Sequence, residues 1–362
     1  MPSKMRDLRL RPYHEVSGAV FRPEADWQVP ANYGGLASEV LAVRSGAGIV
    51  DLSDRAKVCV RGADRTSFLD GLITADVKVL EPGASAYALV LTDKSRVVGD
   101  LRVYAFENHY VLDIERRQAG PLLAYIQKFL ISDDVVLEDL SSSGHLEVHG
   151  PDAARIVSAT AGVDVRGLLP DHVASFAVEK RRVGHVARVG GVGEPGFALW
   201  AEGADLAAGW SRFLRRGIAP VGRDAFDVLR IEAGVPRVGA DMGEDTLALE
   251  VAPARAINFS KGCYVGQEVV ARGTYRGHMN RRLMGLQVDG DVPPERGNRV
   301  RTAHGDVGHV SSGTWSPSLG RVIALALLRI EEVGPSTELS IDRGGWDLRA
   351  ALHPLPFVRA RG

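Results

Sequence analysis

The sequence predicts an α+β fold. Helical and strand patterns alternate along the chain without the regular strand, helix, strand order of a parallel sheet, and glycine-rich turns separate them. After Arg282 the pattern changes to short apolar runs between turns, and Asp289-Gly290, directly after the run 283–288, is the clearest hairpin signal. The segment 282–362 is therefore expected to form a small all-β domain.

Two stretches of the N-terminal region, 58–64 and 146–152, each combine an alternating strand, a glycine turn and an aspartate near the start of an apolar helix. They lie far enough apart for a duplicated subdomain, although this order of elements also recurs by chance. Further helices are expected over residues 204–216 and 223–233, where apolar side chains recur at helical spacing.

The composition is that of an ordinary globular protein. Of 362 residues, 45% are apolar and 25% charged, and 44 basic against 45 acidic side chains leave a net charge of −1. The length allows two or three domains with a sizeable core. The near-zero net charge excludes nucleic-acid binding through a global positive field. Binding through a local basic patch is not excluded by the net charge. No segment has the length of a membrane span or the apolar core of a secretory signal, so a cytoplasmic protein without a membrane partner is expected.

Cysteine is scarce, and the common metal and nucleotide motifs are missing. Cys59 and Cys263 are the two cysteines, and they lie about two hundred positions apart. The sequence contains no C-x-x-C, no H-E-x-x-H and no Walker phosphate loop. We therefore expect neither a zinc site nor a disulfide framework, and no metal ligands are assigned.

Residues 191–196 satisfy the pattern G-x-G-x-x-G, but they are not expected to bind a dinucleotide. That fingerprint requires a helix directly afterwards, whereas here Pro195 and a strand-like run follow. A hairpin turn is expected instead, with Glu194 projecting from it. The carboxylate is either a solvated surface charge or an acceptor of paired hydrogen bonds from a flat heterocycle such as a pterin.

Asp100 stands where an alternating strand pattern begins, although aspartate is disfavoured inside strands. It is either a turn residue at the end of the strand or a buried carboxylate. A buried carboxylate beside a bound base could hydrogen-bond and polarise a reactive nitrogen.

Residues 261–272 read K-G-C-Y-V-G-Q-E-V-V-A-R, and two glycines bracket the cysteine. Lys261 and the basic strip over residues 272–282 would favour a thiolate, so Cys263 is a candidate reactive cysteine. On composition alone, a small buried hydrophobic residue is the favoured alternative. The strip is either a solvated basic face or a site for carboxylate or phosphate groups.

These residues together resemble the superfamily of the glycine-cleavage T-protein (aminomethyltransferase) and the YgfZ-type folate-binding proteins, over nearly the whole chain. Residues 261–268 match the K-G-C-[FY]-x-G-Q-E signature of the YgfZ branch, and T-proteins lack this cysteine. Residues 43–53, 229–234 and 312–320 are more similar to T-proteins.

The resemblance implies a three-lobed α+β body around a folate channel, with two interleaved subdomains over residues 1–281 and a β-barrel domain over 282–362. It places Asp100 beside the reactive nitrogens of tetrahydrofolate, Glu194 on the pterin edge and Arg230 along the channel. Phe226 replaces one arginine of the T-protein pattern, and Arg223 stands close to that position.

By resemblance, the leading function is that of a tetrahydrofolate-binding protein of the YgfZ type. Such a protein would support iron-sulfur cluster assembly or repair, with a link to tRNA modification and iron-sulfur assembly proteins as partners. Cys263 would then handle a cluster, sulfur or a one-carbon fragment. The alternative is a tetrahydrofolate-dependent aminomethyltransferase or demethylase, which the intact Asp100 favours. Direct nucleic-acid binding by the basic strip is not expected, since few aromatic side chains accompany it. The oligomeric state and the one-carbon donor stay open.

Overall fold

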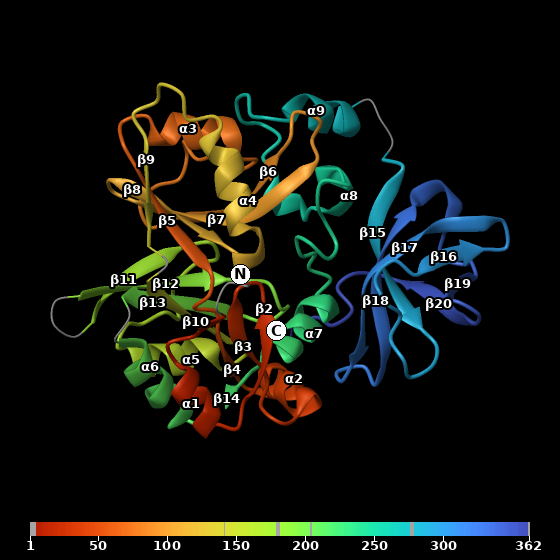
Figure 1. Ribbon diagram of the computed structural model, residues 1–362, viewed down its shortest axis with the longest axis horizontal. Coiled ribbons are helices and arrows are strands. Elements are labelled where there is room, and N and C mark those ends of the chain that lie inside the picture. Colours follow the sequence, from red (N-terminus) through yellow and green to blue (C-terminus); the bar gives the residue numbers. More distant parts are fainter. Residues whose placement is uncertain (1–4, 141, 179–181, 203–204, 276–278, 361–362) are drawn as a thin grey trace.

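The computed structural model describes residues 5–140, 142–178, 182–202, 205–275 and 279–360, and Figure 1 shows their arrangement. Its helices are α1 (Arg11–Val16), α2 (Leu36–Ser45), α3 (Arg65–Leu72), α4 (Arg116–Gln127), α5 (Ala153–Ala161), α6 (Asp205–Leu214), α7 (Arg223–Glu232), α8 (Ala248–Val251) and α9 (Gln267–Tyr275), with short 3-10 turns η2 (Ala254–Ala256) and η3 (Ile330–Glu332). The helices expected over 204–216 and 223–233 are α6 and α7.

Two large sheets form the body of the molecule. In spatial order, the five-stranded sheet contains β6 (Ser85–Leu91), β7 (Val97–Phe106), β8 (His109–Ile114), β5 (Ala56–Arg61) and β9 (Val136–Asp139). The six-stranded sheet contains β11 (Val173–Val178), β12 (Arg182–Val189), β13 (Gly196–Glu202), β10 (Ser143–His149), β4 (Gly48–Asp51) and β14 (Ala219–Pro220). A small third sheet contains β1 (Arg6–Asp7), β3 (Trp27–Asn32) and β2 (Val20–Glu24).

The two large sheets pack between layers of helices (Figure 1). Helices α3 and α4 cover the outer face of the five-stranded sheet, where Leu69 and Leu122 join its apolar core. Helices α5 and α6 cover the six-stranded sheet, with Trp210 fully buried in that core. A separate apolar cluster, which includes Tyr104 and Trp200, joins the inner faces of the two sheets. Each sheet therefore has one face toward helices and one toward the other sheet.

The C-terminal region is a closed barrel. Its strands, in spatial order, are β15 (Arg281–Val288), β18 (Arg321–Arg329), β17 (Gly305–Ser316), β16 (Arg299–Thr302), β19 (Leu339–Asp342) and β20 (Asp347–His353). An apolar cluster fills its interior, with Leu286, Val310 and Ala326 among its members. The predicted α+β fold with a C-terminal β-barrel is confirmed.

One turn prediction in the barrel is wrong. Strand β15 ends at Val288, as the turn signal Asp289-Gly290 implies, but β15 does not form a hairpin with the next strand. It pairs with β18 and β20, whereas β16 pairs with β17 and β19. Closure of the barrel joins strands that are distant in sequence, so a local turn signal does not reveal the partner.

The two similar sequence stretches fold alike. The first forms β5 followed by α3, and the second forms β10 followed by α5. Strand β5 lies in the five-stranded sheet and β10 in the six-stranded sheet, so the two stretches contribute to facing layers. This arrangement brings Lys57 of β5 and His145 of β10 into contact between the sheets.

Candidate functional site

A cavity of about 370 Å³ opens between the two large sheets, helix α7 and the chain that follows α7. Strand β7 supplies one wall because side chains alternate between the two faces of a strand. Leu101, Val103 and Ala105 face the helix-covered core, while Asp100, Arg102 and Tyr104 line the cavity. The alternation that the sequence shows at Asp100 thus places Asp100, Arg102 and Tyr104 at the cavity.

Asp100 lies inside β7, opposite Leu89 of β6, so its interpretation as a turn residue at the strand end is wrong. The hydroxyl of Tyr87 donates a hydrogen bond of 2.6 Å to its Oδ2. The amide of Gln118, on α4, donates to Oδ1 and accepts the backbone N–H of Asp100 at 2.9 Å. Burial raises the pKa of the Asp100 carboxyl, and the hydrogen bonds from Tyr87 and Gln118 oppose that rise. Asp100 is therefore a carboxyl group suited to exchange a proton inside the cavity.

Aromatic side chains provide flat contact surfaces in the same cavity. Tyr87, Tyr104 and Phe226 line it. Tyr104 is fully buried, its ring centroid lies 4.5 Å from that of Trp200, and its hydroxyl has no hydrogen-bond partner among the described residues. A buried hydroxyl without a partner is costly, so this group is available to a polar atom of a ligand.

Arg223 and Arg230 lie on α7, a helix of ten residues, and both line the cavity. The Arg223 guanidinium contacts the Asp54 carboxylate and donates to the backbone oxygen of Asp51 at 3.1 Å. Its Nε has no hydrogen-bond partner among the described residues. The Nε–H group of Arg223 is thus a hydrogen-bond donor that a ligand could use.

Arg230 connects the cavity to the barrel. It donates to Asp227 at 2.8 Å and contacts Asp241, and its Nη2 donates to the Ser312 hydroxyl of β17 at 2.8 Å. The charge of Arg230 is already matched by two carboxylates. Its contribution at the cavity wall is therefore chiefly to fix α7 against the barrel.

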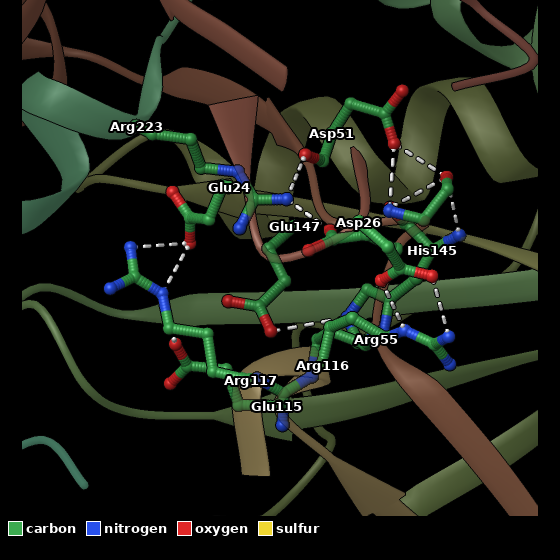
Figure 2. Close-up of polar contacts among 12 residues, drawn as sticks. Glu24, Asp26, Asp51, Arg55, Glu115, Arg116, Arg117, His145, Glu147 and Arg223 are labelled. Carbon is green, nitrogen blue, oxygen red and sulfur yellow. Dashed lines mark hydrogen bonds and ion pairs between the residues drawn. The ribbon is translucent and has the colours of Figure 1, made fainter. Parts of the chain in front are cut away.

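A second polar group at the cavity could not be recognised from the sequence. Glu24 of β2 is buried and pairs with Arg237 at 3.1 Å. It also pairs with Arg117 at 3.1 Å, and Figure 2 labels both residues of this second pair. Arg237 also pairs with Glu115 at 2.7 Å. Nearby charges of arginines hold the pKa of Glu24 below its usual range although burial acts in the opposite direction. No spacing in the sequence relates these residues, because they come from separate elements.

Glu194 lies in the turn between β12 and β13, and these strands pair with Val189 opposite Gly196. The predicted hairpin is confirmed. Glu194 is only 5% exposed, so its interpretation as a solvated charge is wrong. Its Oε1 accepts from Arg44 at 3.1 Å, whereas its Oε2 is buried without a hydrogen-bond partner among the described residues. Glu194 is not among the residues that line the cavity, and contact with a pterin stays a prediction.

Cys263 is exposed and lies outside the cavity lining, whereas Cys59 is buried. The interpretation of Cys263 as a buried hydrophobic residue is therefore wrong. The Lys261 ammonium is buried and pairs with Asp70 at 2.9 Å, so its charge is already matched. In the basic strip, Arg281 pairs with Glu250 at 2.9 Å, and residues 276–278 lie outside the described residues.

The described part of the chain offers neither a metal site nor a membrane-spanning helix. It contains no group of three or more His, Cys, Asp or Glu side chains placed to hold a metal ion. Among the same residues, no helix has the length and apolar character needed to cross a membrane.

Comparison with known proteins matches both parts of the chain. Residues 10–261 match the GCVT N-terminal domain, and residues 281–359 match the glycine cleavage T-protein C-terminal barrel domain. An aminomethyltransferase of Geobacillus kaustophilus is 32% identical over 340 residues, which cover 92% of this chain and 93% of the relative. One of Rubrobacter xylanophilus is 31% identical over 99% of this chain and 95% of the relative. The crystal structure of glycine cleavage system aminomethyltransferase T from Bartonella henselae is similar with a TM-score of 0.88 and 26% identity, over 99% of each chain.

Proposed function

Because the chain belongs to the glycine-cleavage T-protein family, we propose that it is a tetrahydrofolate-dependent transferase of one-carbon groups, of the aminomethyltransferase or demethylase kind. One observation carries the proposal: Asp100 presents a carboxyl group with a raised pKa to a cavity of ligand size between the two sheets. The names of the relatives support transferase activity over the iron-sulfur role expected from the YgfZ branch.

The residues of the cavity fit tetrahydrofolate as the acceptor of the one-carbon unit. A volume of about 370 Å³ lies in the usual range for pockets that hold one small organic molecule. The unpartnered Tyr104 hydroxyl would meet a polar edge of the ring, and the aromatic walls would cover its faces. Arg255, exposed at the cavity, would attract the acidic tail of the folate.

Tetrahydrofolate would supply the nucleophilic nitrogen that accepts the one-carbon unit. Asp100 would hold or release the proton of that nitrogen at a carboxylate oxygen, since burial brings its pKa closer to neutral pH. Tyr87 and Gln118 would keep the carboxylate in one orientation through their hydrogen bonds. The facing sheets would exclude water, which strengthens each of these polar contacts.

Binding is tested first. The full chain is titrated anaerobically with tetrahydrofolate while tryptophan fluorescence is followed, because Trp200 packs against the cavity residue Tyr104. We expect saturable binding that weakens in the Tyr104→Phe variant. Absence of binding up to about millimolar ligand, equivalent to about 4 kcal/mol, contradicts the proposal.

Transfer is tested with S-aminomethyl dihydrolipoamide as donor and tetrahydrofolate as acceptor. Asp100→Asn should bind tetrahydrofolate but transfer at least about a hundredfold more slowly, since loss of an acid or base costs on the order of 10² to 10⁴. The control is Asp93→Asn, an exposed aspartate in the turn before β7. Equal rates in the two variants would exclude Asp100 from the chemistry.

A second candidate function rests on the exposure of Cys263 within the sequence K-G-C-Y-V-G-Q-E. An accessible thiol in a folate-binding protein is compatible with the handling of sulfur or of a cluster for iron-sulfur proteins. In that case Cys263, rather than Asp100, would carry the function. Glu194 would contact the pterin in either case, if tetrahydrofolate binding opens a path from the cavity to its unpartnered oxygen.

A further inference from the structure

We propose that Glu147 is a binding group for a positively charged nitrogen, and that it holds the protonated amine of the one-carbon donor. The part of this inference that concerns the donor rests on the proposed transferase function. The part that concerns ammonium binding does not require folate.

The carboxylate of Glu147 is held at the cavity wall by two imidazoles of its own strand. His145, Glu147 and His149 alternate along β10, so their side chains share one face of the sheet. Leu146 and Val148, on the other face, belong to the apolar core. Nε2 of His145 lies 3.1 Å from Oε1 of Glu147, and Figure 2 shows these two side chains together with Arg55.

The second imidazole completes the arrangement. Nε2 of His149 lies 2.8 Å from Oε2 of Glu147. Gly196 faces His149 on the neighbouring strand, and a β-carbon at that position would overlap the imidazole ring. On its other side the His149 ring lies near Phe226, with centroids 5.5 Å apart. The His149 imidazole is therefore held in place by packing. Each carboxylate oxygen of Glu147 has one imidazole contact, Oε1 with His145 and Oε2 with His149.

The hydrogen-bond partners indicate which ring nitrogens carry protons. Nδ1 of His145 lies 2.6 Å from the Lys57 ammonium, which can only donate, so Nδ1 accepts and Nε2 donates to Glu147. These contacts keep the pKa of Glu147 well below its usual range, although burial acts in the opposite direction. Glu147 is therefore an anion throughout the neutral pH range. Each of its oxygens can still accept a hydrogen bond from a ligand.

Four other carboxylates at the cavity pair with arginine or lysine. Asp100 instead accepts hydrogen bonds from Tyr87 and Gln118, and burial raises its pKa, so it gains a proton more readily than Glu147 does. Arg55 and Lys57 pair with Asp113 at 2.7 and 3.0 Å. Arginines pair in the same way with Glu24, Glu115 and Asp227. Among the described residues, the ion pairs of Glu147 are formed with His145 and His149, and no arginine or lysine lies within 4.0 Å of it. Arg55 interacts electrostatically with Glu147, but the Arg55 guanidinium donates its hydrogen bond to Asp113.

This difference points to a cationic ligand. The Glu147 side chain is 13% exposed, and its carboxylate stays ionised. A hydrogen bond to such a carboxylate is strongest when the donor is positively charged. A protonated amine supplies both the charge and N–H donors. Because Asp100 lines the same cavity, an ammonium group at Glu147 would lie in the chamber where the proposed proton exchange takes place.

The experiment measures binding of methylammonium chloride to the full chain at constant ionic strength, with methanol as the neutral probe of similar size. Trp200 reports on the site, since its ring centroid lies 6.4 Å from that of His145. We expect saturable fluorescence changes with methylammonium and none with methanol. In Glu147→Gln, methylammonium affinity should fall at least tenfold, while tetrahydrofolate affinity changes less than about twofold. Glu138→Gln, an exposed glutamate on β9, serves as the matched control and should bind as the unchanged protein does.

Equal responses to methylammonium and methanol would overturn the proposal, and so would unchanged methylammonium binding in Glu147→Gln. A fall in tetrahydrofolate affinity alone would assign Glu147 to the folate ring instead. Should Glu147→Gln not fold, as judged by circular dichroism, the comparison of the two probes on the unchanged protein decides. Failure of the tetrahydrofolate titration contradicts the proposed transferase but leaves the ammonium site standing, so the two failures are distinguishable.

Discussion

The Tyr87 hydroxyl lies 2.6 Å from Oδ2 of Asp100, on the neighbouring strand of the five-stranded sheet. The hydrogen bond stabilises the ionised carboxylate, while burial stabilises the protonated form. Burial and the Tyr87 hydrogen bond therefore act on the Asp100 pKa in opposite directions, so the pKa depends on Tyr87. This dependence gives a way to test the role of Asp100 without removing it.

Removal of the Tyr87 hydroxyl should move the pH dependence of the reaction. In Tyr87→Phe the ionised form of Asp100 loses a donor, so its pKa rises by about one unit, equivalent to a hydrogen bond of about 1.4 kcal/mol. If ionised Asp100 is the active form, the acidic limb of the rate profile shifts to higher pH. Transfer rates between about pH 5 and 9 measure the shift. Tyr125→Phe, which alters a hydroxyl bound to the Leu91 carbonyl, is the control, and an unshifted limb in Tyr87→Phe would count against Asp100.

The Arg44 guanidinium should contribute strongly to stability. It is buried and pairs with Glu232 at 2.8 Å and with Glu194 at 3.1 Å. Arg44→Met would leave two buried carboxylates without their cation, which costs about 3–5 kcal/mol. Urea unfolding measures this loss. Arg61→Met removes an exposed pair with Glu138 and should cost less than about 1 kcal/mol, and similar losses in both variants would contradict the buried network.

The same network joins the barrel to the body of the molecule. Glu232, on α7, accepts hydrogen bonds from the hydroxyls of Ser316 at 2.6 Å and Ser318 at 2.9 Å. These serines lie within and just after β17, so Glu232 fixes the helix that carries Arg223 and Arg230 against the barrel. Loss of the Arg44 contact is therefore expected to disturb the cavity as well as the global stability.

Acid should destabilise the protein through Asp113. Arg55, Lys57 and His145 hold the pKa of Asp113 well below its usual range in the folded state, although burial opposes them. Because the folded pKa is depressed, the stabilisation is complete above the unfolded value near pH 4 and is lost as the pH falls below it. Urea midpoints measured from pH 7 to pH 3 should therefore decrease most steeply below about pH 4.5. Asp113→Asn should flatten this decrease, and Asp93→Asn should not. Parallel curves for all three proteins would contradict the assignment.

Local patterns predicted the elements that hold the site. The alternation around Asp100 gave the strand that carries it, and helical spacing gave α7. The glycine-rich stretch 191–196 was correctly expected to be a hairpin, because Pro195 and the following apolar run favour a strand over a helix. In each of these cases the signal and the structure it predicts lie within about ten residues.

The site's charge pairing could not be predicted because its partners are distant in sequence. Arg44 and Glu194 are 150 residues apart, and Lys57 and His145 are 88 residues apart. Burial of Glu194 depends on Arg44, which its own neighbourhood does not reveal. Glu147 and His149 were visible in a strand pattern, but the position of Glu147 at the cavity wall depends on how two sheets face each other.

The two cysteines should differ in reactivity. Cys263 is exposed and Cys59 is buried, and burial raises the pKa of the Cys59 thiol. A thiol reagent should therefore label one cysteine of the native protein rapidly, and unfolding should expose the second. Cys263→Ala should remove the rapid reaction and Cys59→Ala should leave it unchanged. Rapid labelling of both thiols in the native protein would contradict this assignment.

Cys263 also separates the two candidate functions. It lies outside the cavity lining, so a transferase that depends on Asp100 should retain tetrahydrofolate binding and transfer in Cys263→Ala within about twofold. A maintenance factor for iron-sulfur proteins should show the opposite pattern: Asp100→Asn would preserve, and Cys263→Ala would lose, the activity of iron-sulfur enzymes in cells that depend on this protein. Both variants are measured in both assays, with Cys59→Ala as the control for loss of a thiol. A transfer rate that falls with Cys263→Ala but not with Asp100→Asn would reject the transferase mechanism, because the reacting group would then lie at the surface loop instead of between the sheets.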